Sequence, residues 1–434
     1  MSAANPDLVT VVGIGAGGWD DLGGTPQRAL AAAPVIFGSA RQLDLLPPEV
    51  TGERIAWPTP LLPALPGLLD AHRRPGRCVL ASGDPMFHGI GATLVRLLGA
   101  SRVRVLPHPS SVSLAAARLG WLLAGASAAS SAASSVASPA ASSVASPAAS
   151  PAASLAAEVV SLVTAEPAVL RRHLAPGRRI LVLARDAASA GAVAAELTAA
   201  GHGAARLTVL EQLGGPAERI VTGVASSWAE PAGDPLAVLA VECGDGPAHA
   251  VVPGLPDDAY ESDGQLTKRE VRAVTLALLA PVPGGLLWDV GAGSGSIGIE
   301  WLRSHPACRA IAVESHPARA ATITANAAAL GVPALRVVTG TAPDALAGLP
   351  APDTIFIGGG VTRDGVLDAC LAALRPGGRL VANAVTVESE AVLAAAHAKL
   401  GGDLVRLSVQ RGSPVGGFTG WRAMMPVTIW SVVP

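Results

Sequence analysis

Short runs of Val, Ile and Leu alternate with Ala-rich stretches along most of the chain. The apolar runs have the length of buried parallel strands, and the stretches between them are typical of helices. This alternation predicts α/β domains with largely parallel sheets. In the N-terminal half the expected strands are Leu8–Ile14, Cys78–Ala81, Val103–Leu106, Val159–Val163, Ile180–Leu183 and Leu236–Val241. No apolar run approaches the ~20 residues that a membrane-spanning helix needs.

The pattern is interrupted twice. Residues 126–154 are almost entirely Ala, Ser and Pro, and SSVASPAA occurs there twice in tandem. Such a tract has little apolar area to offset the entropy of ordering, so we predict a disordered insertion. A second boundary lies near residues 244–264, which are rich in Gly, Pro and Asp. The expected organisation is a first lobe at 1–108, a second lobe at 109–245, a linker at 246–264 and a C-terminal domain at 265–434.

The same alternation restarts in the C-terminal domain with a helix from about Lys268. The expected strands are Leu286–Val290, Ala310–Val313, Leu335–Val338, Thr354–Ile357 and Arg379–Ala384. At the end of the chain, two further apolar segments flank a Gly-rich connection. We predict that these segments, Leu404–Gln410 and Met424–Val432, form an antiparallel hairpin.

Charge and cysteine content exclude several classes of protein. Lys and Arg number 31 and Asp and Glu 33, so the net charge of −2 argues against a non-specific nucleic-acid binder. The four cysteines lie far apart and form no C-x-x-C motif, which indicates reduced core residues and no metal site. The N-terminal residues lack a basic and then apolar export signal. We therefore expect a cytoplasmic protein that does not associate with membranes, and we expect a homo-oligomer.

A glycine turn follows the strand at 286–290 in the sequence LLWDVGAGSGSIGIEWL. Gly291, Gly293 and Gly295 let the backbone approach a ligand closely at the carboxyl end of a strand. The next expected strand ends in Glu314, where a carboxylate can accept hydrogen bonds from ribose hydroxyls. The spacing differs from that of dinucleotide-binding loops, because the third glycine would fall on Ser296. The pattern favours a nucleotide-like ligand.

The region from residue 289 onward resembles the class I S-adenosylmethionine-dependent methyltransferases. The likeness rests on the glycine loop, Glu314, Asn326, DTIFIGGG at 353–360 and LRPGGRLVAN at 374–383. It implies that Glu314 holds the ribose of the cofactor. The methionine end of the cofactor would lie in the glycine loop, on Gly291, Ala292, Gly293, Ser294 and Gly295. The adenine would lie beside Gly340, Thr341 and Ala342. Three glycines at 358–360 replace the Pro-Pro-Tyr clamp of amine-methylating relatives, which favours carbon methylation.

A second glycine motif, with Gly13, Gly15 and Gly18, follows the first expected strand. It does not predict a dinucleotide site, since the expected helix begins only at Pro26, with Thr25 as its cap. This motif, VLASGDPMFHGIG at 79–91 and HPSSVSLAAARLGW at 108–121 together resemble the tetrapyrrole methylases. That resemblance implies two α/β lobes with S-adenosylmethionine between them. The residues implied to bind it are Gly13, Gly15, Gly17, Gly83, Asp84, Ser110 and Ser111.

The order of the two regions resembles that of bifunctional enzymes of cobalamin biosynthesis. The likeness covers the chain except for the Ala/Ser/Pro tract, and it implies a precorrin substrate and one S-adenosylmethionine per catalytic domain. The N-terminal half would methylate ring carbon 5. The C-terminal half would methylate carbon 15 and decarboxylate the acetate at carbon 12. One departure is that Val163, Thr164 and Ala165 replace the usual His-Gly-Arg, so a basic substrate contact is lost.

Several roles stay open at the level of sequence. Thr267 is expected to cap the helix that starts with Lys268 and Arg269, and these residues either contact cofactor and substrate or form a solvated helix start. Arg363 has the same two interpretations for substrate binding. His88 and His108 are proton carriers or structural residues. The alternative functions are a methyltransferase acting on RNA or protein through the C-terminal half, and a cofactor-binding scaffold with one inactive half.

Overall fold

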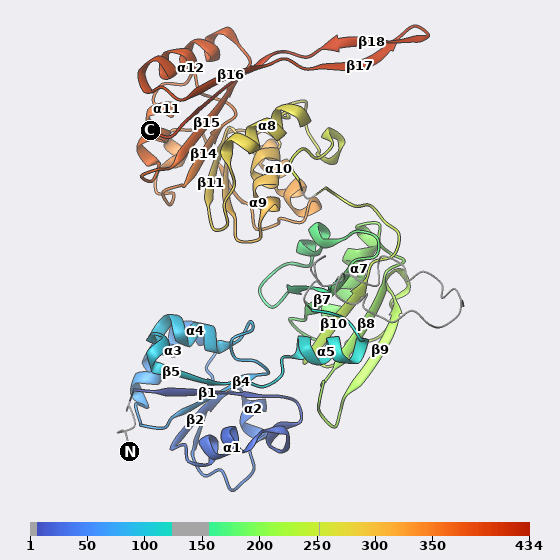
Figure 1. The fold of residues 1–434 in the computed structure, drawn as a ribbon, viewed down its shortest axis with the longest axis vertical. Helices are drawn as coiled ribbons and strands as arrows, with labels where there is room; N and C mark the ends of the chain where they lie inside the picture. Colours follow the sequence, from blue (N-terminus) through green and yellow to red (C-terminus); the bar gives the residue numbers. More distant parts are fainter. Residues whose placement is uncertain (1–6, 124–155, 251) are drawn as a thin grey trace, which may run out of the picture. The chain divides into compact units, whose positions relative to one another are not determined.

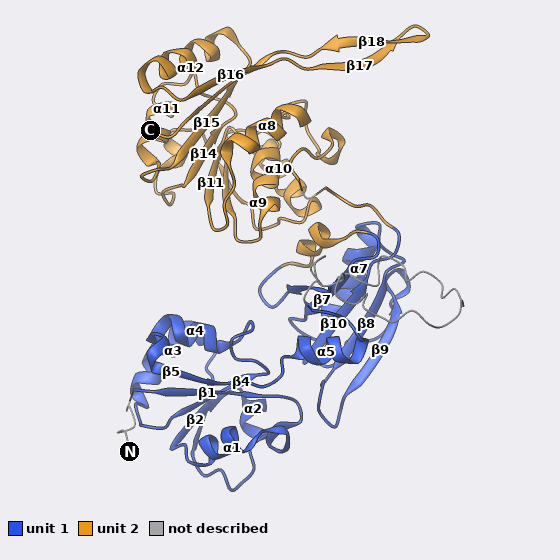
Figure 2. Cartoon of the chain, viewed as in Figure 1, with its two compact units in different colours: residues 1–165, 176–245 blue, residues 166–175, 246–434 orange. Residues whose placement is uncertain are grey.

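The computed structural model describes residues 7–123, 156–250 and 252–434. The insertion expected at residues 126–154 lies outside these described residues. The chain divides into two compact units, which Figure 2 colours separately. Unit 1 comprises residues 1–165 and 176–245, and unit 2 comprises residues 166–175 and 246–434.

Unit 1 begins with a five-stranded sheet, here called lobe 1, in the order β3-β2-β4-β1-β5 (Figure 1). All its neighbouring strands are parallel, as predicted. Val9 and Val11 pack into the core on one face, and Val12 and Ile14 into the core on the other. The strands are β1 (Val9–Ile14), β2 (Val35–Gly38), β3 (Glu53–Ala56), β4 (Cys78–Ser82) and β5 (Val103–Leu106). The helices are η1 (Gly18–Asp21), α1 (Gly24–Ala31), α2 (Ala40–Asp44), α3 (Leu61–Ala71), α4 (Ile90–Leu98) and η2 (Ala100–Arg102).

The predicted start of the first helix is wrong. Helix α1 begins at Gly24 with Gly23 as its N-cap, and Thr25 lies inside its first turn. The Thr25 hydroxyl accepts a hydrogen bond from Arg28 Nη2 at 3.1 Å. Because glycine is a poor helix former, the sequence does not predict that the first turn of the helix includes Gly24.

The second sheet of unit 1, here called lobe 2, corrects the expectation of largely parallel sheets. Its order is β6-β7-β10-β8-β9, and only the β6–β7 pair is parallel. Short connections such as residues 212–218 can join only antiparallel neighbours. The strands are β6 (Glu158–Ser161), β7 (Arg179–Leu183), β8 (Arg206–Glu211), β9 (Arg219–Val224) and β10 (Ala237–Glu242). The helices are α5 (Ser111–Leu119), α7 (Ser189–Ala199) and η5 (Ala225–Ser227).

Unit 2 is built on a seven-stranded sheet in the order β13-β12-β11-β14-β15-β19-β16. The first five strands of this order are parallel, and β19 runs antiparallel to both of its neighbours. The strands are β11 (Leu286–Val290), β12 (Arg309–Glu314), β13 (Arg336–Thr339), β14 (Thr354–Ile357), β15 (Arg379–Ala384), β16 (Asp403–Leu407) and β19 (Val427–Val432). The chain leaves β11 toward β12 on one side and later returns to β14 on the other. A crevice therefore forms at the carboxyl end of β11.

Helices cover both faces of this sheet. Residues of α8 (Arg269–Leu279), α9 (Ser296–Ser304) and α10 (Pro317–Ala329) pack in one core, and those of α11 (Val366–Ala373) and α12 (Val387–Leu400) in the other. Three short helices complete the unit, namely η4 (Pro167–His173), η6 (Asp257–Ala259) and η7 (Asp344–Leu346). Helix η4 contacts α10, although it comes from the middle of the chain.

The two terminal segments pair antiparallel, as predicted, because β16 lies beside β19. Their connection holds a second hairpin, formed by β17 (Gln410–Val415) and β18 (Phe418–Ala423), which extends away from the sheet in Figure 1. The sequence prediction missed this hairpin because its glycines and exposed side chains give no buried strand pattern.

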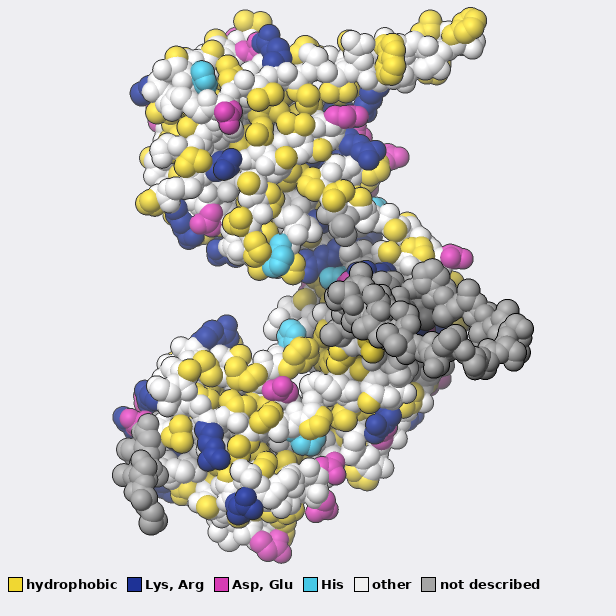
Figure 3. All heavy atoms as spheres, in the orientation of Figure 1, with side chains coloured by type: hydrophobic (Ala, Val, Ile, Leu, Met, Phe, Trp, Pro, Cys, Tyr) yellow, Lys and Arg dark blue, Asp and Glu magenta, His cyan; other side chains and the backbone are white. Residues whose placement is uncertain are grey.

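No helix in the described part of the chain is long and apolar enough to cross a membrane. On the face drawn in Figure 3, the described Lys and Arg side chains lie dispersed among acidic and hydrophobic ones. This distribution fits the near-zero net charge of the sequence.

Candidate active sites

A cavity lies in unit 2 at the carboxyl ends of β11, β12, β13 and β14. Seven residues predicted from the sequence line it: Gly291, Gly293, Glu314, Gly340, Thr341, Ala342 and Arg363. Gln265 and Arg319 also line it, although no motif in the sequence singled out either residue. The structure thus brings the glycine loop, the acid and the segment after β13 together.

The three loop glycines all have positive φ, between 60° and 79°. A Cβ on Gly291 would lie 2.7 Å from the backbone oxygen of Gly359, and a Cβ on Gly293 would lie 3.1 Å from that of Gln265. Gly295 is the N-cap of α9, where a Cβ would press on the side chain of Ile323. The loop is therefore a tight cradle in which side chains would clash with neighbouring residues.

Glu314 is bonded directly to the glycine loop. Its side chain is almost fully buried at the end of β12. Oε2 accepts a hydrogen bond from the backbone N–H of Gly293 at 2.8 Å, and Oε1 accepts one from that of His316 at 2.9 Å. The register places Val290 opposite Val313, so the ends of β11 and β12 hold loop and acid side by side.

Asp289, near the end of β11, is a buried acid whose role the sequence did not predict. Oδ2 accepts a hydrogen bond from the backbone N–H of Gly298 at 2.9 Å, and Oδ1 has no partner among the described residues. Burial, with a smaller contribution from nearby Glu314, raises the pKa of Asp289 to about 7. A charged residue within the apolar run LLWDV was the signal available in the sequence. Its carboxyl group connects the strand to α9 below the cradle.

The segment that precedes α8 is anchored by a buried polar network. Glu300 accepts hydrogen bonds from the backbone N–H groups of Gly254 and Leu255, from the Tyr260 hydroxyl and from Arg272 Nε, at 2.5 to 3.0 Å. The Arg272 side chain is fully buried and lies over the Tyr260 ring. This network positions the segment that carries Gln265 into the cavity.

Asn326 fixes the same segment to the loop. Its Nδ2 donates to the backbone oxygens of Glu261 and Ser294, at 2.9 and 3.0 Å. Ser294 lines a smaller neighbouring pocket, and Ala292 accepts the N–H of Gly295. Asn326, quoted from the sequence as part of the resemblance, is thus a positioning residue.

Residues 267–269 do not line the cavity. Lys268, and not Thr267, is the N-cap of α8, so the predicted cap is wrong. The Thr267 carbonyl oxygen accepts a hydrogen bond from Arg272 Nη1, which holds that residue in the buried network. The backbone N–H of Arg269 donates to Asp257 Oδ1 at 2.9 Å. A capping motif in the sequence does not predict this contact between Arg272 and the Thr267 carbonyl.

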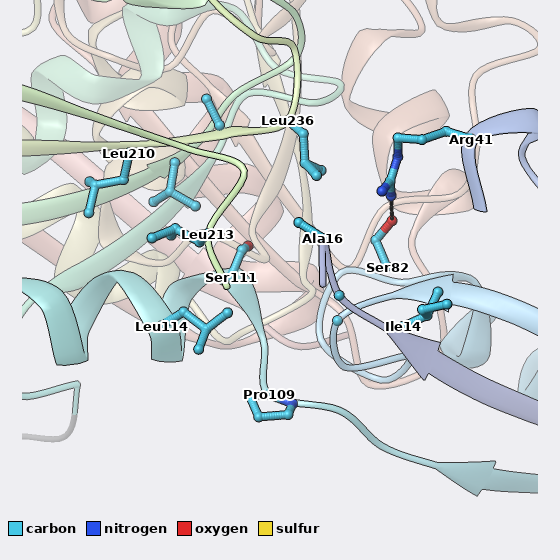
Figure 4. Close-up of a pocket in the computed structure, with 14 residues that line it drawn as sticks. Ile14, Ala16, Arg41, Ser82, Pro109, Ser111, Leu114, Leu210, Leu213 and Leu236 are labelled. Atoms are coloured by element: carbon cyan, nitrogen blue, oxygen red, sulfur yellow. Dashed lines mark hydrogen bonds between the residues drawn. The ribbon is translucent and has the colours of Figure 1, made fainter. Parts of the chain in front are cut away.

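A second cavity lies in unit 1 between residues of lobe 1 and lobe 2 (Figure 4). The predicted residues Gly15, Gly83 and Ser111 line it. Most of the remaining lining is apolar and includes Leu114, Leu210, Leu213 and Leu236. Arg41 also lines this cavity and was not singled out from the sequence.

Four predicted residues of unit 1 lie outside the cavity lining. A Cβ on Gly13 would lie 2.7 Å from the backbone nitrogen of His108, and one on Gly17 would meet Asp21. Asp84 Oδ1 accepts the N–H of Met86 at 2.9 Å, and Ser110 caps α5 through the N–H of Ser113. These residues shape the turns that border the cavity.

Comparison with protein families agrees with this architecture. The sequence model of the family described as tetrapyrrole (corrin/porphyrin) methylases matches residues 8–229, and that of the precorrin methyltransferase domain matches residues 258–434. These matches define a methyltransferase in which a tetrapyrrole methylase is joined to a precorrin methyltransferase domain, and the fold agrees with them.

Individual relatives narrow this class. The precorrin-6Y C(5,15)-methyltransferase (decarboxylating) of Sinorhizobium sp is 46% identical, with 99% of this chain and 98% of the relative covered. The protein of that name from Mycobacterium tuberculosis (strain CDC 1551 / Oshkosh) is 47% identical, with 98% and 99% covered. A probable cobalt-precorrin-6B C(15)-methyltransferase (decarboxylating) of Pyrobaculum calidifontis is 37% identical, with 41% of this chain and 94% of the relative covered. The chain belongs to the precorrin-6Y C(5,15)-methyltransferase (decarboxylating) family.

Proposed function

We propose that this chain converts precorrin-6B to precorrin-8. It methylates ring carbons 5 and 15 and removes carbon dioxide from the acetate at carbon 12. The observation that carries the proposal is the 46% identity, over 99% of the chain, to a relative named for both methylations and for decarboxylation. The methyl donor is S-adenosylmethionine, with one molecule in each unit. A cavity lined by glycines that the sequence predicts is present in each unit, which supports this number.

In unit 2 the glycine loop and Glu314 fit such a cofactor. Gly291 and Gly293 line the cavity, and the neighbouring backbone of Gly359 and Gln265 leaves no room for a side chain at either position. Each Glu314 oxygen accepts one strong backbone hydrogen bond, and a carboxylate has about four acceptor positions. Glu314 can therefore bind ribose hydroxyls while it keeps the loop in place. Gly340, Thr341 and Ala342, after β13, would flank the adenine.

When bound, S-adenosylmethionine supplies an electrophilic methyl group on a sulfonium. Attack by an electron-rich ring carbon is an in-line displacement, which needs alignment and exclusion of water more than a strong base. Gly358, Gly359 and Gly360 carry no side chain that could hold an exocyclic amine, which fits a carbon acceptor. Arg363 lines the same cavity and would bind a substrate carboxylate. Lys268 and Arg269 would contact the macrocycle outside this cavity.

We assign methylation of carbon 5 to unit 1 and the other two steps to unit 2. The Pyrobaculum relative supports this division. Its name includes C(15) methylation and decarboxylation but no C(5) methylation, and only 41% of this chain matches it. In unit 1, Gly15, Gly83 and Ser111 would contact the cofactor directly. Gly13, Gly17, Asp84 and Ser110 would hold the surrounding turns in shape.

The test is incubation of the full chain with precorrin-6B and S-adenosylmethionine labelled with carbon-13 in the methyl group. Mass analysis should find two labelled methyl groups added and one carbon dioxide lost. Carbon-13 NMR should place the methyl groups on carbons 5 and 15. A Gly293→Val chain is the matched control, and it should give a product methylated only at carbon 5. A product without label at either carbon would refute the proposed function.

A further inference from the structure

The cavity of unit 1 contains one charged side chain among the described residues that line it, Arg41. The other lining residues are glycines, serines, alanines, a proline and larger aliphatic residues. Figure 4 shows the Arg41 side chain reaching from α2 toward Ser82 at the border of the cavity. Arg41 is half-buried, and a guanidinium that loses part of its solvation without an ionic partner is unfavourable, so its position needs an explanation.

Local structure holds Arg41 firmly in this place. Ser39 and Gln42 form a capping box at the start of α2, which fixes the backbone on both sides of Arg41. Arg41 Nη2 donates a hydrogen bond to Ser82 Oγ at 3.2 Å. Gln42 Nε2 donates to the same oxygen at 3.1 Å, so Ser82 is held by two side chains of α2. The guanidinium is therefore pre-positioned beside Gly83 of the glycine-rich turn.

The charge of Arg41 is not matched within the described part of unit 1. The hydrogen bond to Ser82 is its only one among the described residues, and no described carboxylate lies within ion-pair distance. Asp234 is the acid whose charge acts on it, but Asp234 accepts hydrogen bonds from Gln212 Nε2 at 2.8 Å and from the N–H of Leu236 at 2.7 Å. Burial lowers the pKa of Arg41, and the charge of Asp234 only partly opposes that effect.

We propose that Arg41 binds a carboxylate of a ligand in the cavity of unit 1. This inference rests on the proposed function, whose substrate and cofactor both carry carboxylates. A guanidinium offers a planar pair of N–H donors that matches a carboxylate, and only one N–H is used by Ser82. Arg41 thus supplies a basic contact in the half of the chain where Val163, Thr164 and Ala165 replace the His-Gly-Arg of the resembling family. The carboxylate comes from an acetate or propionate of the precorrin, or from the methionine end of S-adenosylmethionine.

The experiment measures KM for both ligands in the methylation of carbon 5 by the full chain. Arg41→Met removes the charge at similar length, Arg41→Lys keeps it, and Arg96→Met on α4 is the matched control. Arg96 is exposed and donates to Thr93 on its own helix. Loss of a charged hydrogen bond should raise one KM by about ten- to one-hundred-fold in Arg41→Met. Arg41→Lys should recover part of this loss, and Arg96→Met should match the unsubstituted chain.

The two KM values distinguish the sources of the carboxylate. A rise for precorrin alone assigns Arg41 to the substrate, and a rise for S-adenosylmethionine alone assigns it to the cofactor. Methylation of carbon 15 in the same samples reports whether each variant is folded. Unchanged KM values for both ligands in a folded Arg41→Met chain would overturn the proposal, as would equal losses in the Met and Lys variants. Failure of the proposed function is a different outcome, namely no 5-methylated product from the unsubstituted chain.

Discussion

The buried pair of Arg272 and Glu300 allows a quantitative prediction about unit 2. The side chain of Arg272 is 0% exposed and that of Glu300 is 2% exposed, with Nε and Oε1 only 2.6 Å apart. Removing one partner of such a pair leaves a buried charge without compensation, which destabilises a protein by about 3–5 kcal/mol. Glu300→Gln should therefore lower the free energy of unfolding of unit 2 by about that amount.

The structure also predicts that the two partners are unequal. Without Arg272, Glu300 would still accept hydrogen bonds from Gly254, Leu255 and Tyr260. Without the Glu300 charge, Arg272 would keep two backbone carbonyls and Asp257, whose carboxylate lies 3.6 Å away. Glutamine would moreover present an amide donor to neighbours that are themselves donors. We expect Glu300→Gln to be more harmful than Arg272→Met by about 1–2 kcal/mol, roughly one hydrogen bond to a charged group.

Hydrogen exchange in increasing urea measures this in the full chain, because peptides from β11 and α9 report on unit 2 alone. The double variant should lose less stability than the sum of the single variants, by about 1–3 kcal/mol. Arg309→Met, at an exposed arginine that bonds to the carbonyl of Gly284, serves as the control. Additive effects, or a Glu300→Gln chain within about 1 kcal/mol of the unsubstituted one, would show that the network does not anchor this segment.

Three further predictions concern the same unit. Gly293→Val should abolish one of two S-adenosylhomocysteine sites in calorimetry, because its φ of 60° and the Gln265 oxygen 3.1 Å from a Cβ exclude a branched side chain; two remaining sites would refute this. The pKa of Asp289 is about 7 in the folded protein and 3.8 in the free group. The protonated carboxyl therefore stabilises the fold fully below about pH 4, and this stabilisation is lost as the pH rises through 7. The total loss in the free energy of unfolding is about 4 kcal/mol. Urea unfolding between pH 4 and 8 should show no such loss of stability in Asp289→Asn. The control Asp364→Asn, at an exposed acid, should show the full loss. The same dependence of stability on pH in both variants would refute the assignment to Asp289. A fragment of residues 253–434 should fold and bind one S-adenosylhomocysteine, since both cores of its sheet lie within it, and an unfolded fragment would show that η4 on α10 is required.

The parallel strands of unit 2 and most of its site could be predicted from the sequence, whereas β2 and β3 of the lobe 1 sheet were missed. Buried parallel strands are continuous apolar runs, and each such run in residues 286–384 became a strand of the sheet. In this topology the residues after neighbouring strands meet at one edge, so a glycine turn after one strand and an acid ending the next imply a site. Gly293 and Glu314 are indeed joined by a hydrogen bond.

Features that depend on antiparallel pairing or on distant contacts could not be predicted in the same way. Strand β9 has only half-buried and exposed residues, and the β17–β18 hairpin is largely exposed, so neither shows an apolar run. The cap of α8 was misassigned because Arg272 binds the carbonyl of Thr267, a contact outside any local capping rule. Such elements are fixed by tertiary partners and leave little trace in the local pattern.

The same reasoning explains why Arg41 emerged only from the structure. In unit 2 the lining of the cavity comes largely from consecutive strand ends of one parallel sheet, so order along the chain predicts proximity in space. In unit 1 the lining combines strand ends of lobe 1 with residues 210–213 and 236–238 of lobe 2, whose sheet is mostly antiparallel. No register rule relates these two sheets, and a single arginine in the short helix α2 of lobe 1 forms no motif. Arg41 thus belongs to lobe 1 but lines a cavity to which both sheets contribute, and a local sequence pattern does not encode such a placement.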